Sequence, residues 1–148
     1  EVMDKKRCAA WKAALDDNGL QAIGYGGMFS RKTVDICLAL GIPQINGWIG
    51  DQTPDQAAAL CKETGVRFNL ENHPQKTARE LLDIIGGGNE WLGVCADTGW
   101  FGTQGVSGPD IIRELGALVL AICTINVWNR VAIATRMVPP IDGKHPIV

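Results

Sequence analysis

Two acidic residues, Glu71 and Asp97, carry the strongest chemical signal in the sequence, because each directly follows a short apolar run that reads as a buried strand. In a barrel of parallel strands both carboxylates would point into the same mouth, within reach of one hard divalent cation. Such an ion polarises hydroxyl and carbonyl oxygens and eases the removal of a proton beside the carbonyl. The alternative is that a strand-end acid caps the next helix or faces water.

His73 lies two residues after Glu71 and therefore on the same side of an extended backbone. It could act as a metal ligand, a proton shuttle or a substrate contact, although a lone histidine is more often a hydrogen-bonded structural group. We predict that Glu71 and His73 are catalytic and that Glu71 and Asp97 bind a metal ion.

Aromatic and amide side chains near the predicted strand ends supply candidates for substrate binding. Trp48 and Trp100 follow strands and could stack on the apolar face of a sugar. Asn46 and Asn72 lie in the same strand-end regions, and we include them in the predicted substrate site. The indoles of Trp11 and Trp91 are assigned to the core.

The elements that must position these residues repeat a helix followed by a strand five times. Ser30 and Thr53 are helix N-cap signals, and Gly41 and Gly65 are stop signals. The predicted helices cover residues 4–18, 30–41, 53–65, 77–85 and 109–115, and the predicted strands cover 20–23, 44–48, 66–70, 91–96 and 118–125. This alternation is typical of a parallel sheet covered by helices, so the fold class is α/β.

Two architectures suit this alternation, an open doubly wound sheet and an eightfold barrel. The polar residues are spread over the ends of several strands, which favours the barrel, because a doubly wound fold concentrates its site at one switch point. The glycines at 24–27 and 86–88 lack the order or the position of a phosphate loop and read as turns. We therefore predict an incomplete TIM-type barrel of about five parallel strands.

Two segments resemble the sugar phosphate isomerase/epimerase (xylose isomerase-like) family. Residues 65–74 are similar to its strand with a metal-binding glutamate, and residues 93–100 to its segment with a metal-binding aspartate. The resemblance covers roughly residues 7–120. It implies that Glu71 and Asp97 are ligands of a divalent metal (Mn, Mg, Zn or Co), and that Glu71 shares in proton transfer. It also implies a small sugar-like or hydroxy-carbonyl substrate.

Residues 122–126 depart from the family pattern. Cys123, Ile125 and Asn126 stand where the family has histidine, lysine and aspartate. A thiolate can bind a softer metal such as zinc, but a packed thiol is the favoured interpretation of Cys123. A second family glutamate would follow Val148, and the strands that open a barrel would precede the first residue. So abrupt a change also suggests a shifted reading frame or a rearranged gene.

The composition is that of an ordinary soluble domain. Of its 148 residues 46% are apolar and 20% charged, and the net charge is -2, which does not favour a nucleic-acid partner. Its apolar runs are shorter than the ~20 residues of a membrane span. The five cysteines are odd in number and lack a CxxC motif, so we expect reduced thiols and a cytoplasmic location.

We divide the chain into a partial barrel over residues 1–127 and a divergent tail over 128–148, a candidate for an extra strand or a swapped arm. An incomplete barrel leaves two sheet edges, which a second copy could cover, so a homo-oligomer is expected. The favoured function is metal-assisted isomerisation or epimerisation of a sugar or sugar phosphate. The alternatives are an oligomeric half-barrel enzyme of other chemistry, a hydrolase or carbonyl reductase, and a non-catalytic relic or binding module.

Overall fold

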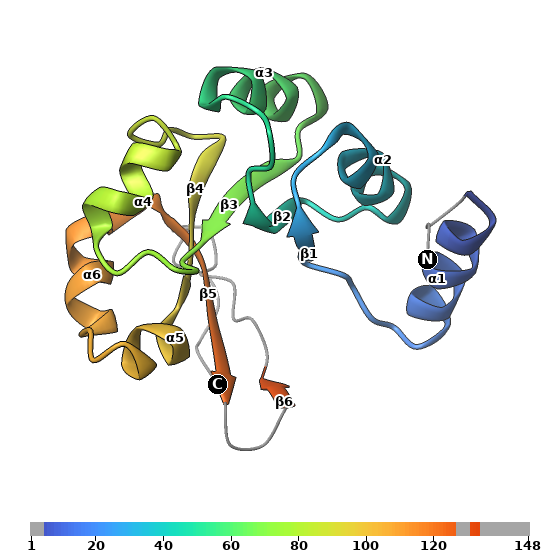
Figure 1. Cartoon of the computed structure of the whole chain (residues 1–148). Helices are drawn as coiled ribbons and strands as arrows, with labels where there is room; N and C mark the ends of the chain where they lie inside the picture. Colours follow the sequence, from blue (N-terminus) through green and yellow to red (C-terminus); the bar gives the residue numbers. More distant parts are fainter. Residues whose placement is uncertain (1–4, 127–130, 134–148) are drawn as a thin grey trace.

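A computed structural model describes residues 5–126 and 131–133 of the chain (Figure 1). The strands are β1 (Tyr25–Met28), β2 (Gln44–Trp48), β3 (Arg67–Glu71), β4 (Leu92–Asp97), β5 (Val119–Asn126) and β6 (Val131–Ile133). The helices are α1 (Lys5–Asp17), α2 (Arg31–Leu40), α3 (Pro54–Thr64), α4 (Ala78–Ile84), α5 (Thr98–Thr103) and α6 (Gly108–Leu115), with a 3-10 turn at η1 (Gly116–Leu118).

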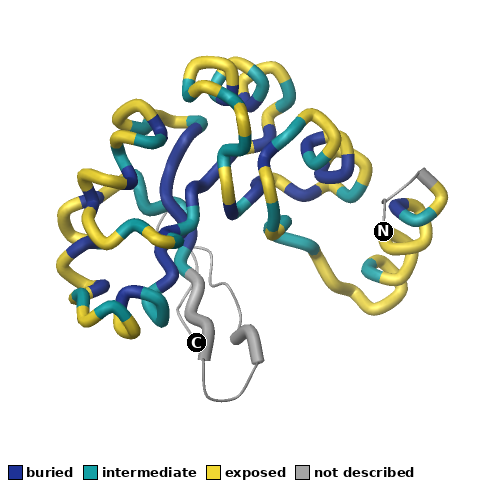
Figure 2. Tube along the Cα trace, in the orientation of Figure 1, coloured by how far each residue is buried: buried dark blue, intermediate teal, exposed yellow. Residues whose placement is uncertain are grey.

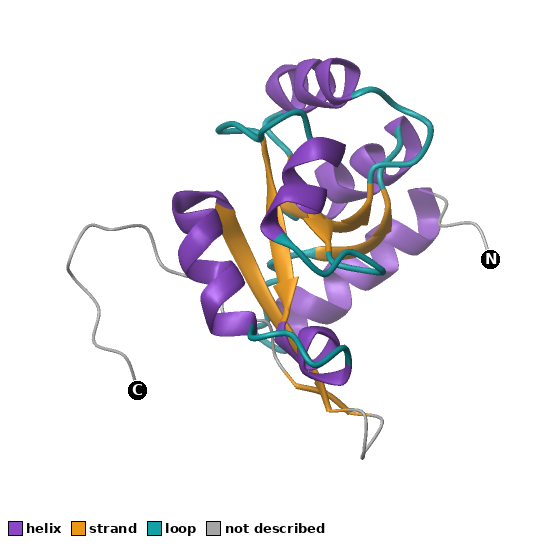
Figure 3. Ribbon diagram, turned by 60° about the vertical axis from the view of Figure 1, so that its left-hand side comes forward, coloured by secondary structure: helices purple, strands orange, loops and turns teal. Residues whose placement is uncertain are grey.

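Strands β1 to β5 are parallel and lie in chain order in one sheet, and β6 pairs with β5 in the antiparallel sense. The sheet curves, and helices α2, α3, α4 and α6 follow its outer side (Figures 1 and 3). Because β1 pairs only with β2 within the described part of the chain, the sheet does not close. The predicted incomplete α/β barrel is confirmed.

The helices begin and end where local signals place them. Ser30, Thr53 and Thr77 each accept a hydrogen bond from the third backbone N–H of the following helix and form a capping box with the side chain of that residue. Gly41 and Gly65 end α2 and α3 in the left-handed conformation, at φ values of 71° and 74°. These signals are local, so the sequence contained them.

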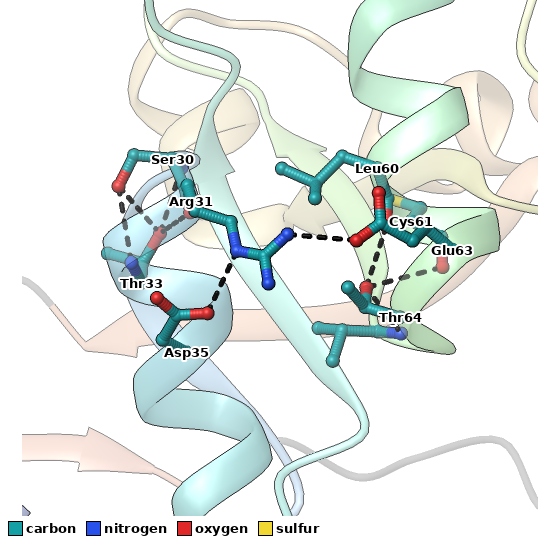
Figure 4. Close-up of polar contacts among 9 residues, drawn as sticks. Ser30, Arg31, Thr33, Asp35, Leu60, Cys61, Glu63 and Thr64 are labelled. Carbon is teal, nitrogen blue, oxygen red and sulfur yellow. Dashed lines mark hydrogen bonds and ion pairs between the residues drawn. The ribbon is translucent and has the colours of Figure 1, made fainter.

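Neighbouring helices are also linked on the surface (Figure 4). Arg31 at the start of α2 donates to Asp35 one turn later and to Glu63 on α3, both at 2.9 Å. These two carboxylates raise the pKa of the guanidinium, the hydrogen bond to Glu63 contributing most. Such exposed ion pairs orient side chains but contribute little to stability.

The main core lies between the sheet and its helices (Figure 2). In β3, Phe68 and Leu70 belong to this core, so the alternating Asn69 and Glu71 lie on the inner, concave face of the sheet. Phe68 also packs against Phe29, with 5.0 Å between the ring centroids. The strand alternation thus separates an apolar helix-facing side from a polar inner side.

Three details of the predicted elements are wrong. Residues 20–23 form no strand, because the pairing of β1 with β2 starts only at Tyr25 and Ile45. Trp11 is 60% exposed instead of buried, since α1 lies beyond the β1 end of the sheet and packs mainly against α2 (Figure 1). The fifth strand begins at Val119 rather than at residue 118, because Leu118 ends the 3-10 turn η1.

Helix α5 was not predicted, because the six residues Thr98–Thr103 include two glycines and give no helical apolar period. The predicted division at 127/128 stays a prediction, and β6 lies within the predicted tail. A swapped arm would involve residues outside the described part of the chain. No helix in that part is long and apolar enough to cross a membrane.

The cysteines whose side chains the structure describes are free and buried: Cys8, Cys37, Cys61 and Cys95. Burial raises the pKa of the Cys37 and Cys61 thiols to about 12, so these thiols stay protonated at neutral pH. The structure describes Cys123 only as part of strand β5 and does not describe its side chain. The prediction of reduced, packed thiols is thus met at four positions, while the location of the protein stays a prediction.

Candidate metal centre

The candidate centre lies at the carboxyl ends of β3 and β4. Glu71 is the last residue of β3 and Asp97 is the last residue of β4. In the register of this parallel pair Glu71 lies beside Cys95, and Asp97 lies two residues further along the same face of β4. Adjacent parallel strands therefore bring the two predicted carboxylates to one place, as the sequence suggested.

His73 lies between the two carboxylates. Its Nδ1 atom is 3.7 Å from Oε1 of Glu71, and its Nε2 atom is 3.4 Å from Oδ2 of Asp97. One ligating atom from each of the three side chains lies within 4.8 Å of the others, so together they could hold one metal ion. Several roles for His73 are compatible with the sequence, and this geometry adds it to the predicted ligands Glu71 and Asp97.

The two carboxylate oxygens of Asp97 have different surroundings. Oδ1 accepts a hydrogen bond of 3.0 Å from the backbone N–H of Trp100 and caps α5. Oδ2 faces His73 and has no hydrogen-bond partner among the described residues, although the side chain is only 1% exposed. A buried carboxylate oxygen without a partner is costly. Since carboxylate and imidazole ligands suit Mn, Mg, Zn or Co, a divalent cation fits this site.

Asn72 is fully buried beside Asp97. Its Oδ1 atom accepts a hydrogen bond of 2.6 Å from the backbone N–H of Asp97, and its Nδ2 atom donates one of 3.1 Å to the backbone carbonyl of the same residue. The sequence predicts Asn72 in the substrate site, and that role stays a prediction. Both of its hydrogen bonds go to the backbone of Asp97.

The other predicted substrate residues lie at two distances from the centre. The ring of Trp100 meets that of His73 edge-on, with 4.6 Å between the centroids, so Trp100 belongs to the immediate surroundings. Trp48 ends β2, one strand away, and is partly exposed. Asn46 also lies on β2, where its Oδ1 atom accepts a hydrogen bond of 2.8 Å from Asn69.

Asn69 and Gln44 were missed by the sequence reasoning. Asn69 is fully buried two residues before Glu71, and its amide donates to Gln44 at 3.1 Å as well as to Asn46. The signal was the alternation in β3, which predicts that Asn69 shares a face with Glu71. These three amides line the inner face of the sheet below the candidate centre.

Solved structures with a similar fold include enzymes that act on sugars. A xylose isomerase domain protein from Planctomyces limnophilus superposes with a TM-score of 0.67 and 18% identity, over 80% of this chain and 57% of the other. D-psicose 3-epimerase, solved in the presence of D-fructose, superposes with a TM-score of 0.68 and 20% identity, over 91% of this chain and 63% of the other. For a sugar phosphate isomerase/epimerase from Parabacteroides distasonis the TM-score is 0.60 and the identity 12%, over 78% of this chain and 55% of the other.

This chain therefore has the fold of part of a xylose isomerase-like α/β barrel. It spans 55–63% of the length of those three structures. No protein-family model matches the sequence, and no curated protein matches it significantly. The likeness confirms the predicted fold, and the activity rests on the site.

Proposed function

We propose that this chain is, or forms part of, a metal-assisted isomerase or epimerase of a small sugar or sugar phosphate. The observation that carries the proposal is the convergence of Glu71, His73 and Asp97 at the strand ends, with the buried Oδ2 of Asp97 left without a hydrogen-bond partner in the described structure. The sugar-handling enzymes that share the fold support the choice of substrate class.

In this proposal the three side chains hold a divalent ion, Mn, Mg, Zn or Co. Asp97 offers Oδ2, because its Oδ1 atom is already engaged by the N–H of Trp100. Glu71 and His73 offer the oxygen and the nitrogen that face this group. When bound, the ion would polarise the hydroxyl and carbonyl oxygens of the substrate. This would lower the cost of removing the proton from the hydroxyl-bearing carbon beside the carbonyl.

Exposure separates the groups that can move a proton from the one that cannot. The Asp97 side chain is 1% exposed and has no surface from which to reach a substrate. The side chains of Glu71 and His73 are 24% and 27% exposed, so each can meet a substrate and exchange protons with it. We assign proton transfer to Glu71 and His73, and we assign the holding of the ion chiefly to Asp97.

The substrate would lie over the inner face of the sheet. Trp100 borders His73, and Trp48 is exposed at the end of β2, so either indole could cover the apolar face of a sugar ring. Asn46, which is partly buried on the same strand, could bond a hydroxyl group. Such contacts would suit a small polyol with a carbonyl group.

Deuterium exchange tests the reaction even where the product is unidentified. The protein is incubated with Mn²⁺ and D-fructose in D₂O, and incorporation of deuterium beside the carbonyl is followed by NMR. We expect incorporation that chelator abolishes and that Glu71→Gln lowers by at least about 100-fold. Glu114→Gln, an exposed carboxylate of α6, is the matched control and should leave the rate unchanged.

Failure to incorporate deuterium into a panel of ketoses and aldoses, despite bound metal, would refute the proposed reaction. A rate that Glu71→Gln leaves intact would refute the role of Glu71.

A further inference from the structure

The side chain of Asn72 takes the place of a peptide group at the end of β3. The last residues in register between β3 and β4 are Glu71 and Cys95. Asp97, two residues further along β4, has no backbone partner on β3 in this register. The Asn72 amide accepts from its N–H and donates to its C=O, as a neighbouring strand would do.

The main chain of β3 cannot make these bonds because it turns away after Glu71. The N–H of His73 donates to the carbonyl of Glu71 at 3.0 Å, which closes a tight turn, and Pro74 follows without an N–H. Both bonds from Asn72 to Asp97 are buried. Loss of the amide would leave a buried donor and a buried acceptor unpaired, which costs more than the bonds themselves contribute.

These bonds fix Asp97 at three points. Asn72 holds its backbone N–H and C=O, and the N–H of Trp100 holds its Oδ1 atom. The only polar atom left is Oδ2, which is directed to His73 at 3.4 Å. Asn72 is also the covalent neighbour of Glu71, so its amide links the two strand ends that carry the carboxylates.

We propose that Asn72 is the positioning residue of the metal centre, which it builds by completing the β3–β4 ladder with its side-chain amide. The inference rests on the proposed metal site. It does not require Asn72 to touch ion or substrate. When a hydrogen bond that orients a metal ligand is removed, the metal affinity of the site typically falls about 10–100-fold.

The test uses two variants and a matched control in the full chain. Asn72→Leu removes the donor and the acceptor at similar volume, and Asn72→Ala removes them but leaves space that a water molecule can fill. Asn69→Leu is the control, because Asn69 is equally buried with two side-chain hydrogen bonds but contacts Gln44 and Asn46 rather than Asp97. Folding is checked by circular dichroism, and Asn72→Ala serves if Asn72→Leu does not fold.

Two readouts are measured, the amide hydrogen exchange of Asp97 in metal-free protein and the titration of Co²⁺ by its visible absorption. We expect exchange at Asp97 to rise about tenfold or more in Asn72→Leu. We also expect Co²⁺ affinity to fall about 10–100-fold with an altered spectrum. Asn72→Ala should fall in between, because a water molecule can replace part of the amide's hydrogen bonding, and Asn69→Leu should keep the wild-type spectrum and the protection of Asp97.

The outcomes separate the two proposals. Wild-type protein that binds no Co²⁺ refutes the metal site, and the positioning role with it. If wild type binds and the folded Asn72 variants keep its affinity, spectrum and Asp97 protection, only the positioning role is refuted. An equal loss in Asn69→Leu would show a general effect of buried amides and would also refute it.

Discussion

Among single residues, Asp97 has both a structural role and a proposed role in metal binding, because its two carboxylate oxygens have different partners. Oδ1 starts α5 by accepting from Trp100, and Oδ2 faces His73. The indole of Trp100 returns to the same imidazole edge-on. Binding of a metal ion at this site should therefore change the fluorescence of Trp100.

Trp100 should report metal binding by fluorescence. We expect Co²⁺ or Mn²⁺ to quench a saturable part of the tryptophan emission, because the Trp100 ring lies 4.6 Å from that of His73. Trp100→Phe should abolish the saturable change. Trp11→Phe, which replaces an exposed indole on α1, should retain it. Quenching that persists in Trp100→Phe would place the ion elsewhere.

The buried thiols should resist alkylation. Burial raises the pKa of Cys37 and Cys61 to about 12, so almost no thiolate forms in the folded protein at pH 8. We expect iodoacetamide to leave both unlabelled in native protein and to label both in guanidinium chloride, as read by peptide mass spectrometry. Rapid native labelling would contradict the packing described.

The same shifts set a direction for alkaline stability. The ordinary thiol pKa is 9.0, so above that pH the unfolded chain loses protons that the folded chain keeps. The contribution of these two thiols to the free energy of unfolding is therefore constant below pH 9 and falls as the pH rises from 9 towards 12. Urea unfolding at pH 8 and pH 10.5 should show lower stability at pH 10.5, and Cys37→Ala should reduce the difference.

At the scale of elements, β1 and β2 approach so closely that a side chain does not fit. Gly47 has a φ of 151°, and a Cβ atom there would lie 2.2 Å from the carbonyl oxygen of Gly27. Neither a rotamer change nor a shift of a flexible side chain relieves a contact with backbone. The pairing that places Trp48 beside Met28 depends on this glycine.

Gly47→Ala should lower the free energy of unfolding by at least about 2 kcal/mol, from the clash and the unfavourable φ together. Gly26→Ala is the matched control, because a Cβ atom at Gly26 meets nothing within 4 Å and its φ is not positive. Equal stability of the two variants in urea denaturation would contradict the close approach of these strands.

The sequence predicted those features that depend on neighbours along the chain. Capping residues and stop glycines located the helices, and short apolar runs located Glu71 and Asp97 at the ends of strands. The role of Asn72 was not predictable, because its amide reaches across to β4 and depends on the register of two strands. Trp11 was misplaced because an apolar helix position is buried only where another element covers it.

At the scale of the whole molecule, the open sheet leaves an apolar side chain of its edge strand uncovered. Met28, at the end of β1, is 61% exposed. In a closed barrel further strands would cover such positions. We propose that in this chain a second copy covers the β1 edge.

Self-association is thus expected, and it should depend on Met28. Sedimentation equilibrium should give the mass of a homo-oligomer for the wild type and a smaller mass for Met28→Lys, because a charge there opposes burial. Leu20→Lys is the control, since Leu20 is 62% exposed in the loop before β1 and not in the sheet. A monomeric wild type, or equal masses for Met28→Lys and wild type, would contradict this proposal.

Whether the open barrel carries a metal centre is decided by counting bound ions. Equilibrium dialysis against Mn²⁺ with elemental analysis gives the number bound per chain. We predict one ion for wild type and for Glu114→Gln, and at least about 100-fold weaker binding for Asp97→Asn, because it neutralises the buried ligand. Wild-type protein without bound metal, or Asp97→Asn with undiminished binding, would contradict a metal centre at these strand ends.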